Sequence, residues 1–354
     1  LTPASGNIIN GFKYPRTGRD WLFFGGFGAT NAINYVADGF FDPNEQVSRD
    51  FRMVDSLVRV FRHSVQEWEC RYNDSGHPTP KNLRVKQYSI ASPNTSYDDG
   101  VIMEFTIENE GATPINDLYA GLIFDFDMVI GIRNKNRCGT DTIRRCVWMH
   151  QDTTENPTIG VKILSPENWA NLACLNNPQY IYPFRGLPDS TKYKFLSGAI
   201  RMYSSAHDTD WTIVSSIGPF SLEPAQEYTC AFAILGGANL NDFYANADSM
   251  QSYYQQIISI EENQTPKFEP TNVKISCLNP IKENGLIKLQ ASEKCAIKLN
   301  LYDALGRYVK SVWQGAGPCN EDIILDTQNL PTGLYFLRLN TEKMTKTLKV
   351  IISR

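Results

Sequence analysis

Strict alternation of apolar and polar side chains restricts the fold of this sequence more than any other feature. In residues 297–302 (IKLNLY), isoleucine and two leucines alternate with lysine, asparagine and tyrosine. After turn-forming sequences, a second strand-like run follows at 334–339, and the alternation returns at 348–352. A period of two is that of a β-strand with one buried face, and tight turns between such strands indicate hairpins. Residues 269–354 are therefore predicted to form a small antiparallel, immunoglobulin-like β-sandwich.

The preceding region, residues 1–268, shows the same period. Apolar residues alternate with glutamate and threonine at 101–108, so that one face of the expected strand is apolar. In the next expected strand, 118–127, both faces carry bulky side chains, which predicts a central position in a sheet. Further strands are expected at 53–61, 65–72, 83–91, 161–164, 211–217 and 228–235. The sequence thus predicts a large antiparallel β-sandwich.

One helix interrupts this β pattern. Between Phe243 and Ile258, apolar side chains recur every three or four residues after a polar start at Asn241 and Asp242. We expect this helix to pack on the large sandwich. The charged segment 261–267, which contains a proline, is expected to link the two domains.

The small domain carries characteristic sequence elements in a fixed order. They are Asn279-Pro280, LYDALGR at 301–307 and LPTGLYFLRL at 330–339, before a terminal strand flanked by lysine. In this order they resemble the C-terminal sorting domain of the bacterial type IX secretion system, over residues 271–354. The resemblance implies a secreted protein, extracellular or on the outer cell surface of a Gram-negative bacterium, whose sorting domain is usually clipped off. The alternative is an immunoglobulin-like module with similar turns that does not sort.

Parts of the large region also resemble known modules. These parts are GFKYP at 11–15, DLYAGLIFDFDM at 117–128, KYKFLSGAI at 192–200 and the run 217–248. They resemble uncharacterised extracellular β-rich modules that precede the sorting domain in type IX cargo and in the tails of subtilisin-like peptidases. The resemblance implies a β-rich region without catalytic function.

The cysteine content agrees with export. There are eight cysteines, and the pairs Cys138/Cys146 and Cys295/Cys319 each bracket a hairpin-sized segment. Such spacing predicts two local disulfides in an oxidising compartment. No C-x-x-C occurs, and the four histidines are scattered, so the sequence does not predict a zinc site. The partners of the other cysteines stay open, namely Cys70, Cys174, Cys230 and Cys277.

Charge and hydropathy exclude two classes of partner. A net charge of −4 and the lack of a basic patch argue against binding to nucleic acid. The apolar runs are far shorter than the roughly 18 residues that a membrane-spanning helix needs, so no transmembrane segment is expected. Because the chain begins with Leu1, we expect that a leader has been removed or that the sequence starts internally.

Catalytic motifs are missing from the sequence. It contains no G-x-S-x-G, H-E-x-x-H, P-loop or dinucleotide fingerprint. The glycine-rich sequence GGFGATN at 25–31 lacks the lysine of a phosphate-binding loop and is interpreted as a turn. His207, Asp208 and Asp210 lie together, and a hydrolase hypothesis would pair His207 with Ser197. A polar loop before a strand explains these residues equally well, so the protein is not expected to be an enzyme.

Paired carboxylates give the best candidate site. Alternation places Asp125 and Asp127 on one strand face, about 7 Å apart. Further oxygen-bearing side chains follow, at Asn134, Asn136 and Asp141. Calcium accepts six to eight oxygens in loose geometry, so Asp125, Asp127 and Asp141 are candidate calcium ligands. The alternative is that both strand aspartates sit at a solvated strand end or bond to nearby amides and Arg133.

These observations leave open which class of extracellular protein the chain represents. We expect a secreted, non-enzymatic structural or adhesive protein, such as a self-assembling subunit of a filament, tube or surface layer. Its partners would be further copies of itself or other surface proteins. The alternative is a carbohydrate- or protein-binding module, accessory to a peptidase-like precursor, in which exposed aromatic rings stack on sugars. For that alternative, the segment 21–24 (WLFF) and Trp169 are the first candidates. No cofactor is required, and calcium is the one candidate.

Overall fold

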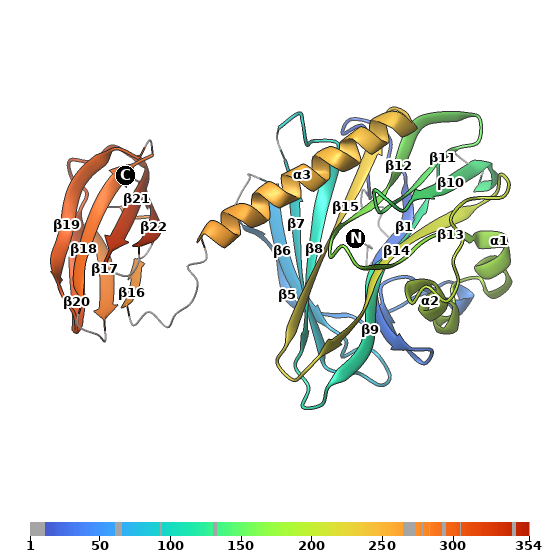
Figure 1. Cartoon of the computed structure of the whole chain (residues 1–354), viewed down its shortest axis with the longest axis horizontal. Coiled ribbons are helices and arrows are strands. Elements are labelled where there is room, and N and C mark those ends of the chain that lie inside the picture. Colours follow the sequence, from blue (N-terminus) through green and yellow to red (C-terminus); the bar gives the residue numbers. More distant parts are fainter. Residues whose placement is uncertain are drawn as a thin grey trace. The chain divides into compact units, whose positions relative to one another are not determined.

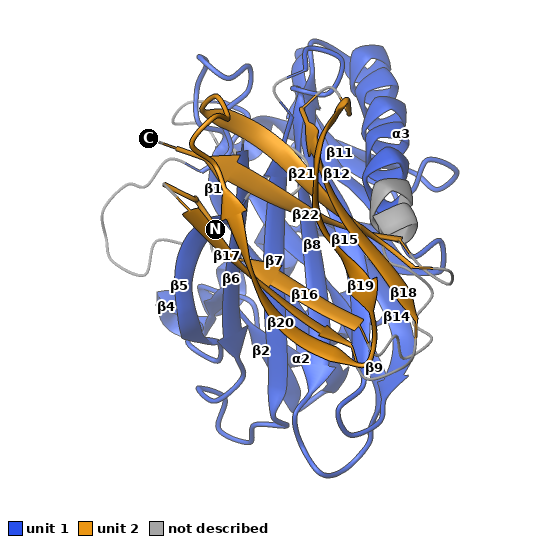
Figure 2. Ribbon diagram, turned by 90° about the vertical axis from the view of Figure 1, so that its left-hand side faces the viewer, with its two compact units in different colours: residues 1–258 blue, residues 259–354 orange. Residues whose placement is uncertain are grey.

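The protein is mainly β and divides into two compact units, residues 1–258 and residues 259–354 (Figure 2). The structure is a computed structural model, and side chains of residues 133 and 259–264 are not among those described. The described residues are 11–60, 66–92, 94–129, 133–264, 273–277, 279–282, 284–291, 295–304, 306–341 and 345–353.

Two antiparallel sheets form the larger unit (Figure 1). The five-stranded sheet has the order β13 (Trp169–Asn176), β14 (Trp211–Leu222), β9 (Ile115–Phe126), β1 (Leu22–Ala32) and β2 (Tyr35–Asp38). The eight-stranded sheet has the order β10 (Asn136–Asp141), β11 (Cys146–Gln151), β12 (Thr154–Ser165), β15 (Glu227–Gly237), β8 (Gly100–Asn109), β7 (Leu83–Ala91), β6 (Gln66–Asn73) and β5 (Arg52–Val60). Short elements complete the unit, namely β3 (Phe41–Asp42), β4 (Gln46–Val47), η1 (Pro43–Glu45) and η2 (Arg133–Lys135).

The core of this unit lies between the two sheets. Phe27 of β1 stacks on Phe105 of β8 with ring centroids 4.2 Å apart, and Phe232 of β15 meets Phe105 edge-on at 6.1 Å. All three side chains are buried, and each such burial contributes roughly 1.5–3 kcal/mol. The predicted central strand is confirmed, because β9 pairs with β1 on one side and β14 on the other.

Helix α3 (Leu240–Gln264) covers the outer face of the eight-stranded sheet (Figure 1). Its apolar stripe, which includes Phe243, Met250 and Tyr254, is buried against strand residues such as Ile102. The predicted helix is therefore confirmed. The helix continues into the segment expected to be a linker, and residues 265–267 of that segment lie outside the described part of the chain.

The outer face of the five-stranded sheet carries elements that were not predicted. They are α1 (Asn177–Tyr180), η3 (Tyr182–Phe184) and α2 (Asp189–Leu196). Phe195 and Leu196 of α2 are buried against Val214 of β14. The short α2 lacks an amphipathic repeat of several turns, so its periodicity alone could not reveal it.

The glycine-rich segment 25–31 is not a turn, as the sequence indicated, but the middle of strand β1. A Cβ atom on Gly25 would lie 1.9 Å from Cδ1 of Phe124 on the neighbouring strand. Glycine is thus needed for close approach of the Phe124 ring rather than for chain reversal.

The smaller unit is a β-sandwich, as the alternation predicts. One sheet has the order β16 (Val273–Cys277), β17 (Asn284–Ala291) and β20 (Cys319–Asp326), and the other has the order β19 (Tyr308–Ala316), β18 (Ala296–Asp303), β21 (Gly333–Asn340) and β22 (Thr345–Ile352). The alternating residues Ile297, Leu299 and Leu301 are fully buried in the core between these sheets.

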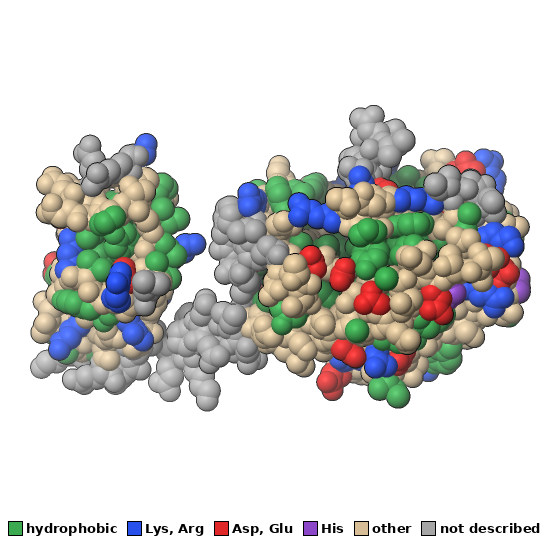
Figure 3. Space-filling model, turned by 90° about the horizontal axis from the view of Figure 1, so that it is seen from above, with side chains coloured by type: hydrophobic (Ala, Val, Ile, Leu, Met, Phe, Trp, Pro, Cys, Tyr) green, Lys and Arg blue, Asp and Glu red, His purple; other side chains and the backbone are tan. Residues whose placement is uncertain are grey.

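The surface over α3 has mixed chemistry. In the face that Figure 3 shows, acidic, basic and apolar side chains are interspersed over the larger unit. None of the described helices is long and apolar enough to cross a lipid bilayer.

Candidate functional site

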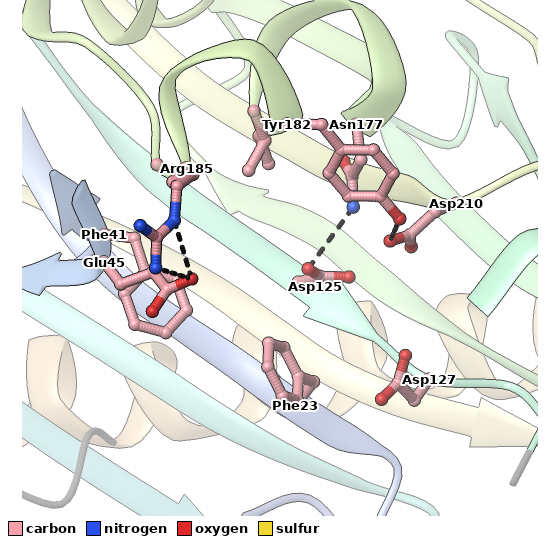
Figure 4. A pocket seen from close by; sticks show the side chains of 11 residues that line it. Phe23, Phe41, Glu45, Asp125, Asp127, Asn177, Tyr182, Arg185 and Asp210 are labelled. Atoms are coloured by element: carbon pink, nitrogen blue, oxygen red, sulfur yellow. Dashed lines mark hydrogen bonds and ion pairs between the residues drawn. The ribbon is translucent and has the colours of Figure 1, made fainter. Parts of the chain in front are cut away.

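A cavity of about 700 Å³ opens in the larger unit beside the end of β9. Strands β1, β3 and β9, the α1–η3 segment and the start of β14 supply its walls (Figure 4). The lining residues are Phe23, Phe41, Glu45, Asp125, Asp127, Asn177, Ile181, Tyr182, Arg185, Gly186 and Asp210. Four of them are acidic and one is basic, so the cavity is predominantly acidic. We call it the acidic cavity.

The alternation along β9 aims two carboxylates at this cavity. Phe124 and Phe126 point into the core between the sheets, whereas Ile123 packs in the cluster under α2. Asp125 and Asp127 share the parity of Ile123 and therefore face the outer side, where Asp125 is buried opposite Thr212 of β14. The two aspartates thus share one face, as predicted.

Asp210 brings a third carboxylate to the same place. It is buried just before β14, and its Oδ2 accepts a hydrogen bond from the hydroxyl of Tyr182 (Figure 4). Its backbone carbonyl accepts a hydrogen bond from the Asn177 N–H at 3.1 Å. One carboxylate oxygen from each of Asp125, Asp127 and Asp210 lies within 4.8 Å of the other two. We call these three residues the open triad.

Asn177 adds a buried amide to the open triad. Its side chain is 1% exposed, and its Nδ2 donates to Oδ2 of Asp125 at 3.3 Å (Figure 4). Among the residues that the structure describes, its Oδ1 has no hydrogen-bond partner. A buried acceptor left in this state costs about 1–3 kcal/mol, so a ligand that engages it would be favoured.

Aromatic rings also line the acidic cavity, with Tyr182 beside Asp210 and Phe23 and Phe41 farther from it (Figure 4). Phe23 is 53% exposed and Tyr182 is 44% exposed, which is unusual for large apolar rings that line a cavity. Phe41 stacks on Phe24 with centroids 3.7 Å apart, and Arg185 pairs with Glu45 at 2.9 Å. Phe23 belongs to the segment 21–24 that the sequence marked for aromatic contacts.

Asp141, the third predicted calcium ligand, does not join the open triad. It ends β10 in the other sheet, where Oδ1 accepts from the backbone N–H groups of Ile143 and Arg144, each at 2.9 Å, and Oδ2 accepts from the Arg144 side chain at 3.0 Å. Burial would raise the pKa of Asp141, but its hydrogen bonds with Arg144 outweigh burial and hold that pKa below its usual range. Asp141 therefore serves as a turn and ion-pair residue.

The other residues of the predicted calcium loop also have different places. Asn134 is exposed, and Asn136 is buried but holds the end of β9, accepting from the Met128 N–H at 3.3 Å and donating to the Phe126 carbonyl at 3.2 Å. The side chain of Arg133, the alternative partner of the aspartates, lies outside the described side chains.

The residues of the hydrolase hypothesis do not form a triad among the described contacts. Ser197 donates to the Lys194 carbonyl at 3.5 Å, while His207 packs edge-on against Trp211 with centroids 6.0 Å apart. Asp208 pairs with Arg137. Of the group that the sequence singled out, Asp210 alone reaches the acidic cavity.

The structure does not bring the predicted Cys138–Cys146 pair together. Cys138 lies opposite Met149 and Cys146 opposite Asp141, three residues farther along β10, so the two side chains enter different cores. Cys138 instead lies beside Cys174 of the facing sheet. Burial, and then the hydrogen bond with the Cys174 thiol, raise the pKa of Cys138.

The second predicted pair, Cys295–Cys319, remains a prediction. Both residues are half-buried, and the Gly317 N–H donates to the Cys295 carbonyl at 2.8 Å at the end of this hairpin. Burial and nearby charges, among them Glu321 and Cys295, raise the pKa of Cys319. All eight cysteines are thiols in this structure.

Fold and cavity together define a β-sandwich protein in two units with an acidic cavity in the larger one. Residues 279–353 match the family model described as the secretion system C-terminal sorting domain. The match confirms the resemblance of the small domain to the type IX sorting domain, and it marks the protein as a secreted, outer-surface cargo. It does not extend to the larger unit, and the comparison with curated proteins gave no match.

Solved structures resemble the chain only distantly. A polysaccharide lyase is 10% identical, with 96% of this chain and 41% of that chain covered and a TM-score of 0.32. A GalM/aldose epimerase homologue from C. elegans is 9% identical, covering 54% of this chain and 69% of that chain, also with a TM-score of 0.32. The BSP domain of a biofilm associated protein is 7% identical, covering 81% and 60%, with a TM-score of 0.18. The chain thus spans 41% of the length of the polysaccharide lyase, and at these TM-scores the likeness does not define a common fold.

Proposed function

We propose that this secreted protein is an adhesive surface protein that binds a carbohydrate in its acidic cavity. The observation that carries the proposal is that exposed aromatic rings and buried polar groups line one cavity. Ligand sites are typically concave, with apolar walls and a few convergent polar groups that fix orientation. A sugar offers both an apolar C–H face and hydroxyl groups, so it matches this combination.

The aromatic and the charged residues of the cavity would make different contacts with a sugar ring. The exposed rings of Phe23 and Tyr182 offer apolar faces for stacking. The carboxylates of the open triad accept hydrogen bonds from hydroxyl groups, and Arg185 donates. The volume of about 700 Å³ falls in the range of 300–1,000 Å³ that is usual for small-ligand sites.

Glycan arrays followed by calorimetry on the full chain test this proposal. Phe23→Ala should weaken binding of the captured glycan by about tenfold, which corresponds to about 1.4 kcal/mol. Trp68→Ala is the matched control, because Trp68 on β6 is 43% exposed but does not line the cavity. Absence of any glycan binding, or equal losses in both variants, would contradict the proposal.

Strand β5 favours a second function, self-association into an assembly. It is an edge strand of the eight-stranded sheet, and its side chains Met53, Val54, Leu57 and Val58 are exposed. An edge strand offers backbone groups for pairing with another strand. Antiparallel pairing of two copies centred on Ser56 would place Val54 opposite Val58, so we assign the second copy of this chain as the partner.

Negative-stain microscopy and light scattering test the assembly. Leu57→Lys should convert assemblies into monomers, because lysine on an edge strand opposes pairing. Ile143→Lys is the control, since Ile143 is 92% exposed but lies away from β5. A wild-type protein that stays monomeric at high concentration would rule out this second function.

A further inference from the structure

We propose that Cys138 and Cys174 form a disulfide that links the two sheets of the larger unit. Cys138 lies on β10 and Cys174 on β13, which are the edge strands of the eight-stranded and the five-stranded sheet. This pairing goes beyond the proposed function. It also differs from the Cys138–Cys146 pair, which the spacing along the chain favours and the structure does not bring together.

Both cysteine side chains point into the core between the sheets. Cys174 shares the parity of Leu172, which is buried in that core. The residues of the other parity, Ala173 and Leu175, belong instead to the cluster under α2. Cys138 is 2% exposed and Cys174 is fully buried, and their thiols are joined by a hydrogen bond. The two sulfur atoms are therefore neighbours before any covalent bond forms.

The segment 202–205 holds the backbones of both cysteines. The Cys174 N–H donates to the carbonyl of Met202 at 2.7 Å. The Ser205 N–H donates to the Cys138 carbonyl at 2.8 Å, and the Cys138 N–H donates to Oγ of Ser205 at 3.1 Å. Because the two ends of one short segment bind the two cysteines, the backbone places them close together independently of the contact between the thiols.

The spacing of the two edge strands suits a covalent link. Strands β10 and β13 lie side by side, with Cα atoms of one strand within 8 Å of Cα atoms of the other (Figure 1). Facing sheets are usually about 10 Å apart, whereas a disulfide joins Cα atoms about 4.4–6.8 Å apart. Immunoglobulin domains of antibodies also carry a disulfide between their two sheets. The narrow spacing at this edge therefore favours an inter-sheet disulfide.

Secretion provides an oxidising environment for this bond. The match of residues 279–353 to the sorting domain marks the protein as secreted cargo, and disulfides persist outside the reducing cytosol. The oxidant is another disulfide, of a small molecule or of a thiol oxidoreductase. One cysteine thiolate attacks it and displaces one of its sulfurs as a thiolate, and the second cysteine then displaces the other. The two cysteines lose two protons and two electrons, and the oxidant becomes two thiols.

The bond is expected to form during folding. Burial raises the pKa of Cys138, and the neighbouring thiol of Cys174 raises that pKa further. The reactive thiolate is therefore scarce once the core has closed. Both sulfur atoms are also shielded from solvent in the folded protein, so a dissolved oxidant or reductant reaches them only when the core opens. Oxidation consequently precedes the closing of the core.

Peptide mapping of the full chain tests the pairing. Protein exported to an oxidising compartment during expression is denatured, its remaining thiols are alkylated, and it is digested without reduction. The expected product is a linked pair of peptides that contain Cys138 and Cys174 and that together are lighter by two hydrogen atoms than the separate thiol peptides. Alkylation of both cysteines, or linkage of either one to a different cysteine, would overturn the proposal.

Thermal unfolding measures the contribution of the bond. In exported protein, Cys174→Ala should lower the melting temperature by roughly 5–15 °C more than Cys230→Ala does. Cys230 is the matched control, because it is fully buried in the same core and its substitution removes a sulfur atom without removing the bond. When both variants are made in a reducing cytosol and kept in reductant, this difference should disappear. Equal losses in exported protein would overturn the proposal.

Discussion

The outer side of the five-stranded sheet carries two groups of three carboxylates, and they differ in their surroundings. In the first group, Asp38, Asp42 and Asp189 surround the ammonium of Lys192, with N–O distances of 2.7, 2.5 and 3.5 Å. The second group is the open triad. Its contacts include the amide of Asn177 and the phenol of Tyr182.

The difference separates a structural group from a binding group. Lys192 is fully buried on α2, so the first group fixes that helix to β2 and excludes an exchangeable ion. Burial alone would lower the pKa of Lys192, but the charges of Asp38 and Asp42 outweigh burial and raise it. The open triad lines a cavity instead, where solutes have access. Cavity access, rather than the number of carboxylates, distinguishes the two groups.

The largest effect is expected from Lys192→Met. Removal of the ammonium leaves Asp38 buried without its charged partner, and breaking such a buried pair costs about 3–5 kcal/mol. Denaturant unfolding measures this loss. Lys194→Met, an exposed lysine on the same helix, should change the free energy of unfolding by less than about 0.5 kcal/mol. Similar values for the two variants would remove the distinction between the groups.

Alkaline pH should remove part of the stabilisation that the ion pairs of Lys192 provide. The pKa of Lys192 is raised in the folded protein above its unfolded value of 10.5. The stabilisation that the ammonium contributes is therefore fully present below pH 10.5, and it declines as the pH rises toward the pKa of the folded state. The difference in unfolding free energy between the wild type and Lys192→Met should therefore narrow above pH 10.5. Unfolding curves between pH 8 and 12 measure it, and a constant difference would contradict the role of the ammonium.

The calcium site that the sequence predicts at Asp125 and Asp127 can be tested at the open triad, where the expected effect is smaller. At a free calcium concentration ten times the dissociation constant, binding stabilises the folded state by about 1.4 kcal/mol. The variant Asp189→Asn, in the first group, should retain this response, whereas Asp127→Asn should lose it. Denaturant unfolding with chelator or calcium measures both. A loss of response in Asp189→Asn would mean that the ion binds at the first group.

The sequence predicted those features that depend on local periodicity. The alternation at 101–108 and 297–302 gave strands and buried faces that the structure confirms, and the apolar repeat of α3 gave its packing face. The alternation also placed Asp125 and Asp127 on one side of β9. Each of these features requires only that neighbours in sequence be neighbours in space.

The features that were missed depend on long-range pairing. Asp210 reaches Asp125 because β14 pairs with β9, across 85 residues of sequence, so proximity along the chain favoured Asp141 instead. The same bias paired Cys138 with Cys146, although Cys174 of the facing sheet is its neighbour. Helix α2 was missed because it is short and because its central Lys192 is buried by ion pairs. Sheet order, which sequence periodicity does not encode, decides the first two cases.

The smallest effect is expected from Tyr182→Phe. This variant tests whether the hydrogen bond from Tyr182 stabilises the fold as strongly as the ion pairs of Lys192 do in the first group. Tyr182 donates a hydrogen bond to Asp210, but its side chain is 44% exposed, so water can replace the lost hydroxyl. The free energy of unfolding in chelator should fall by less than about 1 kcal/mol. Denaturant unfolding measures this change. A loss as large as that of Lys192→Met would mean that Tyr182 is a structural partner of Asp210, and that both groups of carboxylates serve the fold.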